Sequence, residues 1–245
     1  MSAKLPCLSV RPDRLYYDIM PVSYDRQTTS ARNPIVRFTH RRRLAMSVGE
    51  AARVAPRGGT LIDYGCGPGT YLSQIGQGRP DLSLIGYDPY AEQTVGGFKV
   101  VDDLFLIPDH SADLLVALET CEHLDESELK DFIAQTHRLL KPSGQLLISI
   151  PVIGGPGLLV KEANRIALHK RCDYSPGELA KAALLGKPAA RPANIKITHK
   201  GFDFRALHVR LAKDMKLTRS WNSPFPELPW MLNSQVFSIW WPTIA

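Results

Sequence analysis

The chain has 245 residues, with 30 lysines and arginines against 24 acidic residues, so its formal net charge is +6. Apolar residues make up 44% of the chain and charged residues 22%, which argues against collagen, a coiled coil or wholesale disorder. The four cysteines stand far apart without zinc-ligand spacing, and no apolar run approaches 18 residues. We therefore expect reduced thiols, a cytoplasmic location, no metal site and no transmembrane helix.

The first predicted helix covers residues 34–55. Asn33 is a suitable capping residue and Pro34 suits the first helical position. An apolar stripe is predicted at helical spacing along this helix, formed by Ile35, Phe38, Leu44, Val48 and Ala52. Short apolar runs then alternate with helical patterns, which predicts buried strands joined by helices. The predicted strands are 60–64, 82–88, 98–101, 113–118 and 145–152, with helices at 70–76 and 127–140 between them.

The remaining chain is less regular. Helices are predicted at 158–171, 176–185 and 203–214, followed by strands at 215–221 and 234–241. The alternation of strands and helices predicts an α/β fold with a parallel sheet and helices on both faces. Two final strands without an intervening helix predict an antiparallel addition to that sheet. The β-α units are too few for an eight-fold barrel.

A glycine-rich loop directly follows the first predicted strand, at residues 65–69 (Gly-Cys-Gly-Pro-Gly). Glycines at such a turn let the backbone approach a ligand closely. Asp88 ends the second predicted strand, where an acid accepts hydrogen bonds from ribose hydroxyls. The G-x-G-x-G spacing differs from the dinucleotide pattern, and Asp63 would repel a pyrophosphate but suit a cationic group. These features predict a nucleoside site for a cationic ligand such as a sulfonium.

The stretch from Asp63 to Gly69 resembles the first motif of the class I S-adenosylmethionine-dependent methyltransferases. The resemblance covers residues 60–152 well and the rest loosely. It implies S-adenosylmethionine as cofactor, S-adenosylhomocysteine as product, and a doubly wound seven-stranded sheet with an antiparallel last strand. It also implies that Asp88 binds the ribose and that Asp102 or Asp103 meets the adenine; the spacing to Pro108 favours Asp103. The cofactor-binding residues expected in full are Asp63, Tyr64, Gly65, Cys66, Gly67, Gly69, Asp88, Pro89, Asp102, Asp103, Leu104, Glu119 and Thr120.

Candidate bases follow the fourth predicted strand. Methyl transfer to a hydroxyl often needs a base, and Glu119, His123 and His199 are the catalytic candidates. His199 lies in a turn that looks like the one bordering the acceptor in several small-molecule methyltransferases. A packing or capping role for His123 and a surface turn for His199 are the alternatives. Glu122 is expected to face solvent or to cap a helix.

Basic residues gather in the first helix. Arg37, Arg41, Arg42 and Arg43 are expected to meet a small anionic acceptor, such as a glycan- or lipid-linked one, or an anionic membrane surface that the protein contacts peripherally. O-methylation of that acceptor is the favoured reaction. The alternatives are a nucleic-acid methyltransferase that uses the same helix and a non-catalytic scaffold that binds the cofactor. Nucleic acid is disfavoured because no Asn-Pro-Pro-Tyr or Asp-Pro-Pro-Tyr sequence follows the fourth strand, and the sequence does not indicate an oligomeric state.

The chain is expected to form a single domain over residues 1–245, with four parts. These are an N-terminal lead-in with the basic helix (1–56), a cofactor-binding core (57–152), a helical insertion that caps the acceptor (153–200) and the C-terminal part of the sheet (201–245).

Overall fold

A seven-stranded sheet forms the centre of the computed structural model, which describes residues 33–90, 97–169 and 172–243. The strand order is β3-β2-β1-β4-β5-β7-β6. All neighbouring pairs are parallel except those of β7, which runs antiparallel to both β5 and β6. The strands are β1 (Thr60–Tyr64), β2 (Ser83–Tyr87), β3 (Lys99–Val101), β4 (Ala112–Leu118), β5 (Leu140–Pro151), β6 (Met215–Ser223) and β7 (Gln235–Pro242). The predicted fold class, with its antiparallel last strand, is confirmed.

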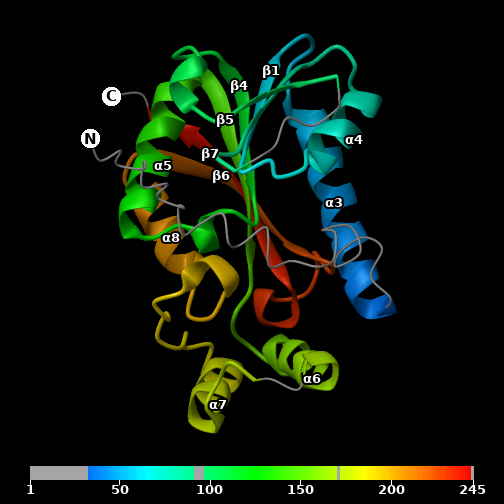
Figure 1. Ribbon diagram of the computed structural model, residues 1–245, viewed down its shortest axis with the longest axis vertical. Helices are drawn as coiled ribbons and strands as arrows, with labels where there is room; N and C mark the ends of the chain where they lie inside the picture. The colour runs from blue at the N-terminus through cyan, green and yellow to red at the C-terminus, as the bar shows by residue number, and fades with distance from the viewer. Residues whose placement is uncertain (1–32, 91–96, 170–171, 244–245) are drawn as a thin grey trace, which may run out of the picture.

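Helices cover both faces of this sheet (Figure 1). On one face lie α3 (Pro34–Val54) and α4 (Thr70–Gly78), and on the other lie α5 (Glu126–Leu139) and α8 (Phe204–Leu211). The helices α6 (Gly157–His169) and α7 (Pro176–Leu185) lie at the lower end of the molecule, beyond the carboxyl end of β5. They occupy the segment predicted as an insertion. None of the described helices is long and apolar enough to cross a membrane.

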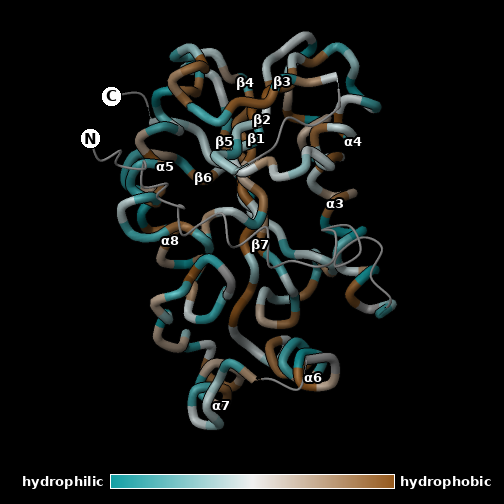
Figure 2. Tube along the Cα trace, viewed as in Figure 1, coloured by the Kyte–Doolittle hydropathy of each residue, from teal (hydrophilic) through white to brown (hydrophobic). Residues whose placement is uncertain are grey.

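Side-chain alternation along the strands divides the interior into two cores. Leu61 and Leu114 point to the face covered by α3 and α4, whereas Ile62 and Leu115 point to the face covered by α5 and α8. All four are fully buried. The hydropathy view shows the same organisation, with the apolar residues concentrated along the strands (Figure 2). Strands that are buried on both faces have continuous apolar sequences, and this pattern allowed them to be predicted from the sequence.

The strand β5 begins five residues earlier than predicted. Leu140 already pairs with Ala112, so the chain passes directly from α5 into the sheet. Residues 141–144 (Lys-Pro-Ser-Gly) separate the predicted helix from the predicted strand, but a register shift between Ala112 and Leu114 accommodates them within β5. A Cβ at Gly144 would lie 2.7 Å from the Ala112 carbonyl oxygen. Only glycine therefore fits at this close approach of the two strands.

The predicted apolar stripe of α3 is only partly correct. Leu44, Val48 and Ala52 pack on the core beneath α3 and α4. Phe38 is exposed instead, and its ring centroid lies 6.3 Å from that of Phe225, in the segment that follows β6. The side chain of Ile35 lies outside the described residues. The first turns of α3 therefore face polar groups and solvent rather than the sheet.

Candidate functional site

The loop between β1 and α4 holds three glycines in the left-handed region, with φ of 83° at Gly65, 49° at Gly67 and 75° at Gly69. A Cβ on Gly65 would lie 2.7 Å from the methyl and hydroxyl groups of Thr120, and a Cβ on Gly69 would overlap the ring of Phe98. A Cβ on Gly67 would meet no atom of the described residues within 4 Å. The loop is thus packed tightly at both ends, and the described residues leave open space over the backbone of Gly67.

Asp88 forms hydrogen bonds with residues at the carboxyl ends of three neighbouring strands, β1, β2 and β3. Its carboxylate accepts hydrogen bonds from the backbone N–H groups of Gly67 and Tyr90, each at 2.9 Å. Its own N–H donates to the carbonyl oxygen of Val101 at the end of β3. A carboxylate has about four acceptor positions. Lone pairs therefore remain on Asp88 for the hydroxyl groups of a ligand.

Asp63 lies beneath the same loop and is 3% exposed. Burial, and to a lesser extent the charge of Asp88, raises the pKa of Asp63 from 3.8 to about 7. Two neighbouring carboxylates in a water-poor site favour a positively charged ligand, because such a ligand stabilises both ionised forms.

These residues fit S-adenosylmethionine, the cofactor implied by the resemblance. The N–H of Gly67 is bonded to Asp88, and the ionised form of Asp63 would be stabilised by the positive charge of a sulfonium or ammonium group. The loop and Asp63 would hold the methionine part, and Asp88 the ribose. When bound, the cofactor supplies an electrophilic methyl group.

The other expected cofactor residues take several positions. The side chains of Tyr64 and Cys66 are buried in the two cores, so their contribution to a ligand would come from the backbone. Asp103 caps a short helix, η1 (Leu104–Leu106), by accepting from the N–H of Phe105 at 2.9 Å. Asp102, Asp103 and Pro89 are exposed and Leu104 is buried. Their roles toward the adenine remain predictions.

The carboxyl end of β4 presents Glu119 and Thr120 beside the glycine loop. The Thr120 hydroxyl donates to the carbonyl oxygen of Tyr64 at 3.2 Å, which ties β4 to β1. Glu119 has a φ of 55°, unusual for a residue with a side chain. Its carboxylate accepts from the hydroxyl of Ser149 at 3.1 Å and pairs with Arg43 of α3 at 3.1 Å. A left-handed residue held by its surroundings is a frequent mark of a functional site.

Three further side chains meet next to Glu119. The Nε2 atoms of His123 and His199 are 3.1 Å apart, and the Nε2 atom of His199 lies 3.8 Å from Oε1 of Glu122. Glu122 lies in η2 (Cys121–His123) and is completely buried, so the expectation that it faces solvent or caps a helix is wrong. Neither oxygen of its carboxyl group has a hydrogen-bond partner in the part of the chain that the structure describes. Burial and the nearby Glu119 raise the pKa of Glu122 well above its ordinary value.

Three further residues complete this group, and the sequence did not predict a place in it for any of them; Arg43 was expected on the basic surface instead. His40 and Arg43 reach it from α3, and Lys161 reaches it from α6, where its ammonium group donates to the carbonyl oxygens of Val152 and Ser234. Burial lowers the pKa of Lys161 to about 8 and that of His40 to about 4. The i,i+3 spacing of His40 and Arg43 places them on one helix face, which was the only signal available. We call the whole group the polar cluster; it comprises His40, Arg43, Glu119, Glu122, His123, Lys161 and His199.

The polar cluster can accept a proton. Burial lowers the pKa of both His123 and His199, so their imidazoles are neutral near pH 7. A neutral imidazole or an ionised carboxylate can act as a general base toward an acceptor hydroxyl. The structure thus brings together all three predicted catalytic candidates, Glu119, His123 and His199. Their catalytic roles remain predictions.

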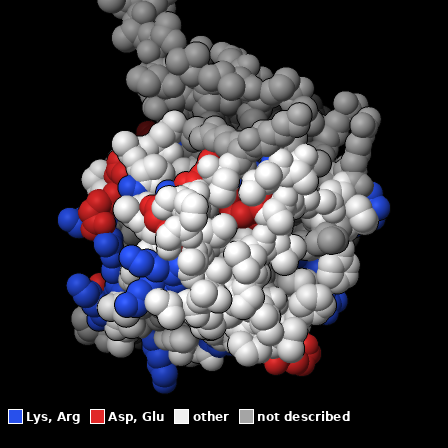
Figure 3. Space-filling model, turned by 90° about the horizontal axis from the view of Figure 1, so that it is seen from below, with Lys and Arg blue, Asp and Glu red and all other residues white. Residues whose placement is uncertain are grey.

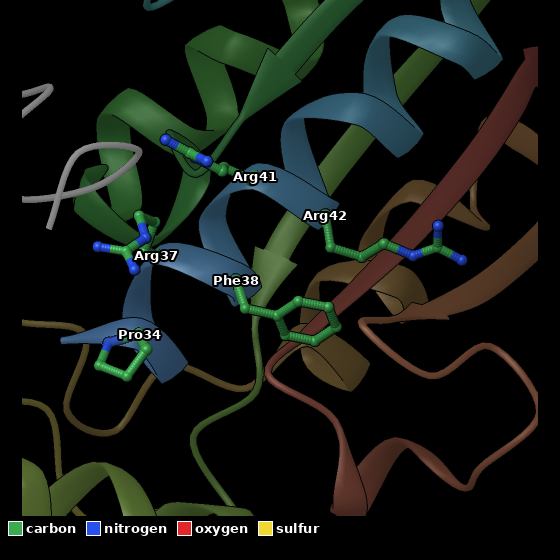
Figure 4. A pocket seen from close by; sticks show the side chains of 5 residues that line it. All are labelled: Pro34, Arg37, Phe38, Arg41 and Arg42. Carbon is green, nitrogen blue, oxygen red and sulfur yellow. The ribbon is translucent and has the colours of Figure 1, made fainter.

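A second feature lies on the other side of α3. Pro34, Arg37, Phe38, Arg41 and Arg42 line a cavity of about 450 Å³ (Figure 4). In this view the side chains of Phe38 and Arg42 extend to the right of the helix, and those of Arg37 and Arg41 extend to the left. Arg43 departs from the expected basic surface, because its side chain is only 12% exposed and is paired with Glu119. Seen from below, the molecule also shows lysines and arginines gathered on one side and carboxylates near the centre (Figure 3).

Comparisons with known proteins agree with this architecture. A family model described as a methyltransferase domain matches residues 37–199. The search of curated proteins found no match. Similar solved structures include the PH0226 protein from Pyrococcus horikoshii OT3, which is 12% identical with a TM-score of 0.61, over 94% of this chain and 99% of that chain.

Two other solved structures resemble the chain at a similar level. A SAM-dependent methyltransferase from Anabaena variabilis ATCC 29413 is 12% identical with a TM-score of 0.54, over 84% of this chain and 86% of that one. The methyltransferase domain of bacterial CtHen1-C is 14% identical with a TM-score of 0.53, over 83% and 98% of the two chains. At these identities the structural likeness shows the fold alone. The family match over most of the chain shows more: the chain belongs to the methyltransferase-domain family and is an S-adenosylmethionine-dependent methyltransferase.

Proposed function

We propose that this enzyme transfers the methyl group of S-adenosylmethionine to a hydroxyl oxygen of a small anionic molecule, such as a glycan- or lipid-linked metabolite. The observation that carries the proposal is the double role of α3. One face of this helix contributes His40 and Arg43 to the polar cluster, and Arg37, Arg41 and Arg42 on its other side line the cavity.

The cavity supports an anionic acceptor. It is an open depression lined by three arginines of one helix, so a bound molecule would meet several positive charges while staying partly exposed to solvent. Guanidinium groups bind phosphates and carboxylates through paired hydrogen bonds. Phe38, which is 51% exposed, supplies an apolar surface for the uncharged part of the same molecule. An acceptor linked to a lipid would be met at an anionic membrane surface on the cytoplasmic side.

The polar cluster supports an oxygen as the acceptor atom. A hydroxyl must lose a proton during methyl transfer, whereas an amine needs only to be neutral. Glu119 and the neutral imidazoles of His123 and His199 offer such a base beside the glycine loop. The cofactor provides the reactive methyl group, so the contribution of these residues is to orient the acceptor and take its proton.

The decisive experiment is an acceptor screen with detection of S-adenosylhomocysteine. The library should pair each phosphorylated or carboxylated compound with its uncharged analogue and include lipid-linked sugars. We expect turnover of an anionic compound, with the new methyl group on oxygen. Preference for an uncharged compound, or methylation of nitrogen or carbon, would contradict the proposal.

A variant series then tests the role of the cavity. Replacing Arg37, Arg41 and Arg42 by alanine should raise KM for the anionic acceptor about tenfold or more, the equivalent of about 1.4 kcal/mol of binding. The affinity for S-adenosylmethionine should not change. Arg57→Ala, an exposed arginine in the turn before β1, is the matched control. Equal KM values in the triple variant and the control would contradict an anion-binding role.

The same variants separate the proposal from its alternatives. Flotation with vesicles that contain anionic lipid measures membrane contact, and the triple variant should lose it. Steeply salt-dependent binding to RNA or DNA, abolished by the same substitutions, would instead favour a nucleic-acid methyltransferase. Tight cofactor binding without turnover of any compound would favour a non-catalytic scaffold.

A further inference from the structure

Glu122, His123 and His199 form a compact group of three metal-ligating side chains next to Glu119. One ligand atom from each residue lies within 4.8 Å of the others. The closest pair, the two imidazole Nε2 atoms, is 3.1 Å apart, and the His199 Nε2 to Glu122 Oε1 distance is 3.8 Å. A divalent metal with bonds of about 2.0–2.2 Å holds neighbouring ligand atoms roughly 3–3.5 Å apart. Small side-chain rotations would bring the three atoms around one ion.

The buried carboxyl group of Glu122 is an independent observation. It is fully buried, and neither of its oxygens has a hydrogen-bond partner among the described residues. The nearby cations are engaged elsewhere: Arg43 pairs with Glu119, and Arg191 donates to the backbone carbonyl oxygen of Glu122 at 2.6 Å. A buried carboxyl group without a partner is costly, and such groups are normally paired or bound to a metal. A dication beside Glu122 would remove this cost.

The surroundings also orient the imidazole of His123. Its Nδ1 atom lies 3.3 Å from the carbonyl oxygen of Ile195. A carbonyl oxygen only accepts hydrogen bonds, so Nδ1 carries the proton and the lone pair of Nε2 points toward His199 and Glu122. Metal-binding histidines are typically held this way, with the other ring nitrogen donating to a backbone carbonyl.

We propose that Glu122, His123 and His199 bind one first-row transition-metal dication. Two imidazoles and one carboxylate suit zinc, iron(II), cobalt(II) or manganese(II) better than calcium or magnesium, which prefer oxygen ligands. Three protein ligands leave at least one coordination position open. An acceptor oxygen bound there would lose its proton more easily, because the metal acts as a Lewis acid. With the metal bound, the Nε2 lone pairs of His123 and His199 are used for coordination, so Glu119 is the remaining base for the acceptor proton. The gain in acidity and the role of Glu119 rest on the proposed function, but the metal site itself does not.

The test is metal binding by the full-length protein after treatment with a chelator. Isothermal titration with Zn²⁺, and titration with Co²⁺ followed through its visible absorption bands, should both show one site per chain. Glu122→Gln and His199→Asn should each weaken binding at least about 100-fold, since changes to outer-shell partners alone cost about 10–100-fold. Zn²⁺ should raise the Tm of the wild-type protein and leave the Tm of both variants nearly unchanged.

Two matched controls exclude nonspecific binding. His110→Asn removes an imidazole just before the amino end of β4, whereas the polar cluster lies at the carboxyl end of this strand. The φ of 50° at His110 suits asparagine. Glu162→Gln removes another buried carboxyl group, on α6. Both should bind metal like the wild type. Wild-type protein without a stoichiometric site, or Glu122→Gln and His199→Asn with unchanged affinity, would overturn the proposal. Binding is measured without cofactor or acceptor, so a failed acceptor screen would not affect this result.

Discussion

The glycine loop and the polar cluster lie at the same edge of the sheet but are built differently. The loop is held through its backbone N–H groups: those of Gly65 and Cys66 donate to the carbonyl oxygen of Tyr87, and that of Gly67 donates to the carboxylate of Asp88. The polar cluster is held by side chains from four separate segments of the chain. It concentrates charged and titratable groups that are mostly removed from water.

This difference predicts two kinds of sensitivity. A backbone loop depends on the space around its Cα atoms, so an added methyl group disrupts it even where no polar contact is lost. A side-chain cluster depends on balanced charges, so removal of one partner leaves another buried and uncompensated. Substitutions in the two regions should therefore differ in mechanism as well as in magnitude.

The largest expected effect belongs to Gly65→Ala. The left-handed backbone costs an L-residue about 1–2 kcal/mol, and the close approach to Thr120 adds about 1–3 kcal/mol. Denaturant unfolding should show a loss of stability of about 2–5 kcal/mol. The control is Gly58→Ala, with a φ of 69° but nothing within 4 Å of the added Cβ, which should cost only the backbone term. Equal losses in the two variants would show that the contact with Thr120 is unimportant.

Arg43→Leu probes the polar cluster in the same way. The ion pair of Arg43 with Glu119 is almost buried, at 12% and 13% exposure of the two side chains. Its removal should lower the free energy of unfolding by about 3 kcal/mol, because Glu119 is left without its cation. Arg42→Leu, on the exposed side of the same helix, should change it by less than about 0.5 kcal/mol. If Arg43→Leu were as mild as its control, the cluster would not depend on this pair.

Asp88→Ala should weaken the binding of S-adenosylmethionine at least tenfold, or about 1.4 kcal/mol. The substitution removes the acceptor for two loop N–H groups and for the expected ribose hydroxyls. Calorimetric titration measures the effect. Asp81→Ala, which removes a surface carboxylate paired with Arg79, is the control and should keep the wild-type affinity. An unchanged affinity in Asp88→Ala would rule out the ribose assignment.

The smallest effect concerns pH. The pKa of Asp63 is about 7 in the free protein, and a cationic ligand prefers the ionised form. Affinity for S-adenosylmethionine should therefore rise about tenfold from pH 6 to pH 8, following the ionised fraction. In Asp63→Asn, any titratable group of S-adenosylmethionine itself still contributes to the pH profile. The rise in affinity that comes from ionisation of Asp63 should be absent. Parallel profiles for the two proteins would show that Asp63 does not titrate in this range.

The raised pKa of Asp63 also makes the stability of the free protein depend on pH. This stability falls as the pH rises, whereas the affinity for the cofactor increases. The folded pKa of Asp63 exceeds its ordinary value of 3.8, so the folded state holds a proton that the unfolded state releases. This contribution to stability is complete below pH 4 and is lost as the pH rises toward about 7. The stability difference between wild type and Asp63→Asn, measured over this range, should follow that change.

The sequence by itself determined the sheet, the glycine loop and the cofactor. These features depend on contiguous residues: buried strands are continuous apolar runs, and the loop motif lies within seven residues, Asp63 to Gly69. Where the sequence failed locally, long-range contacts were responsible. The pairing of Leu140 with Ala112 extends β5 through residues 141–144, which separate the predicted helix from the predicted strand. The ring of Phe38 lies near that of Phe225 instead of joining the expected apolar stripe.

Only the tertiary structure decided the composition of the polar cluster. Its members come from α3, the end of β4, α6 and the turn before α8, and no spacing along the chain relates Lys161 to His199 or Arg43 to Glu119. Glu122 was misjudged for the same reason, since its burial depends on segments far from it in sequence. Backbone geometry is encoded locally by residue type, whereas the partner of a buried charge is set by which distant segments the fold brings against it.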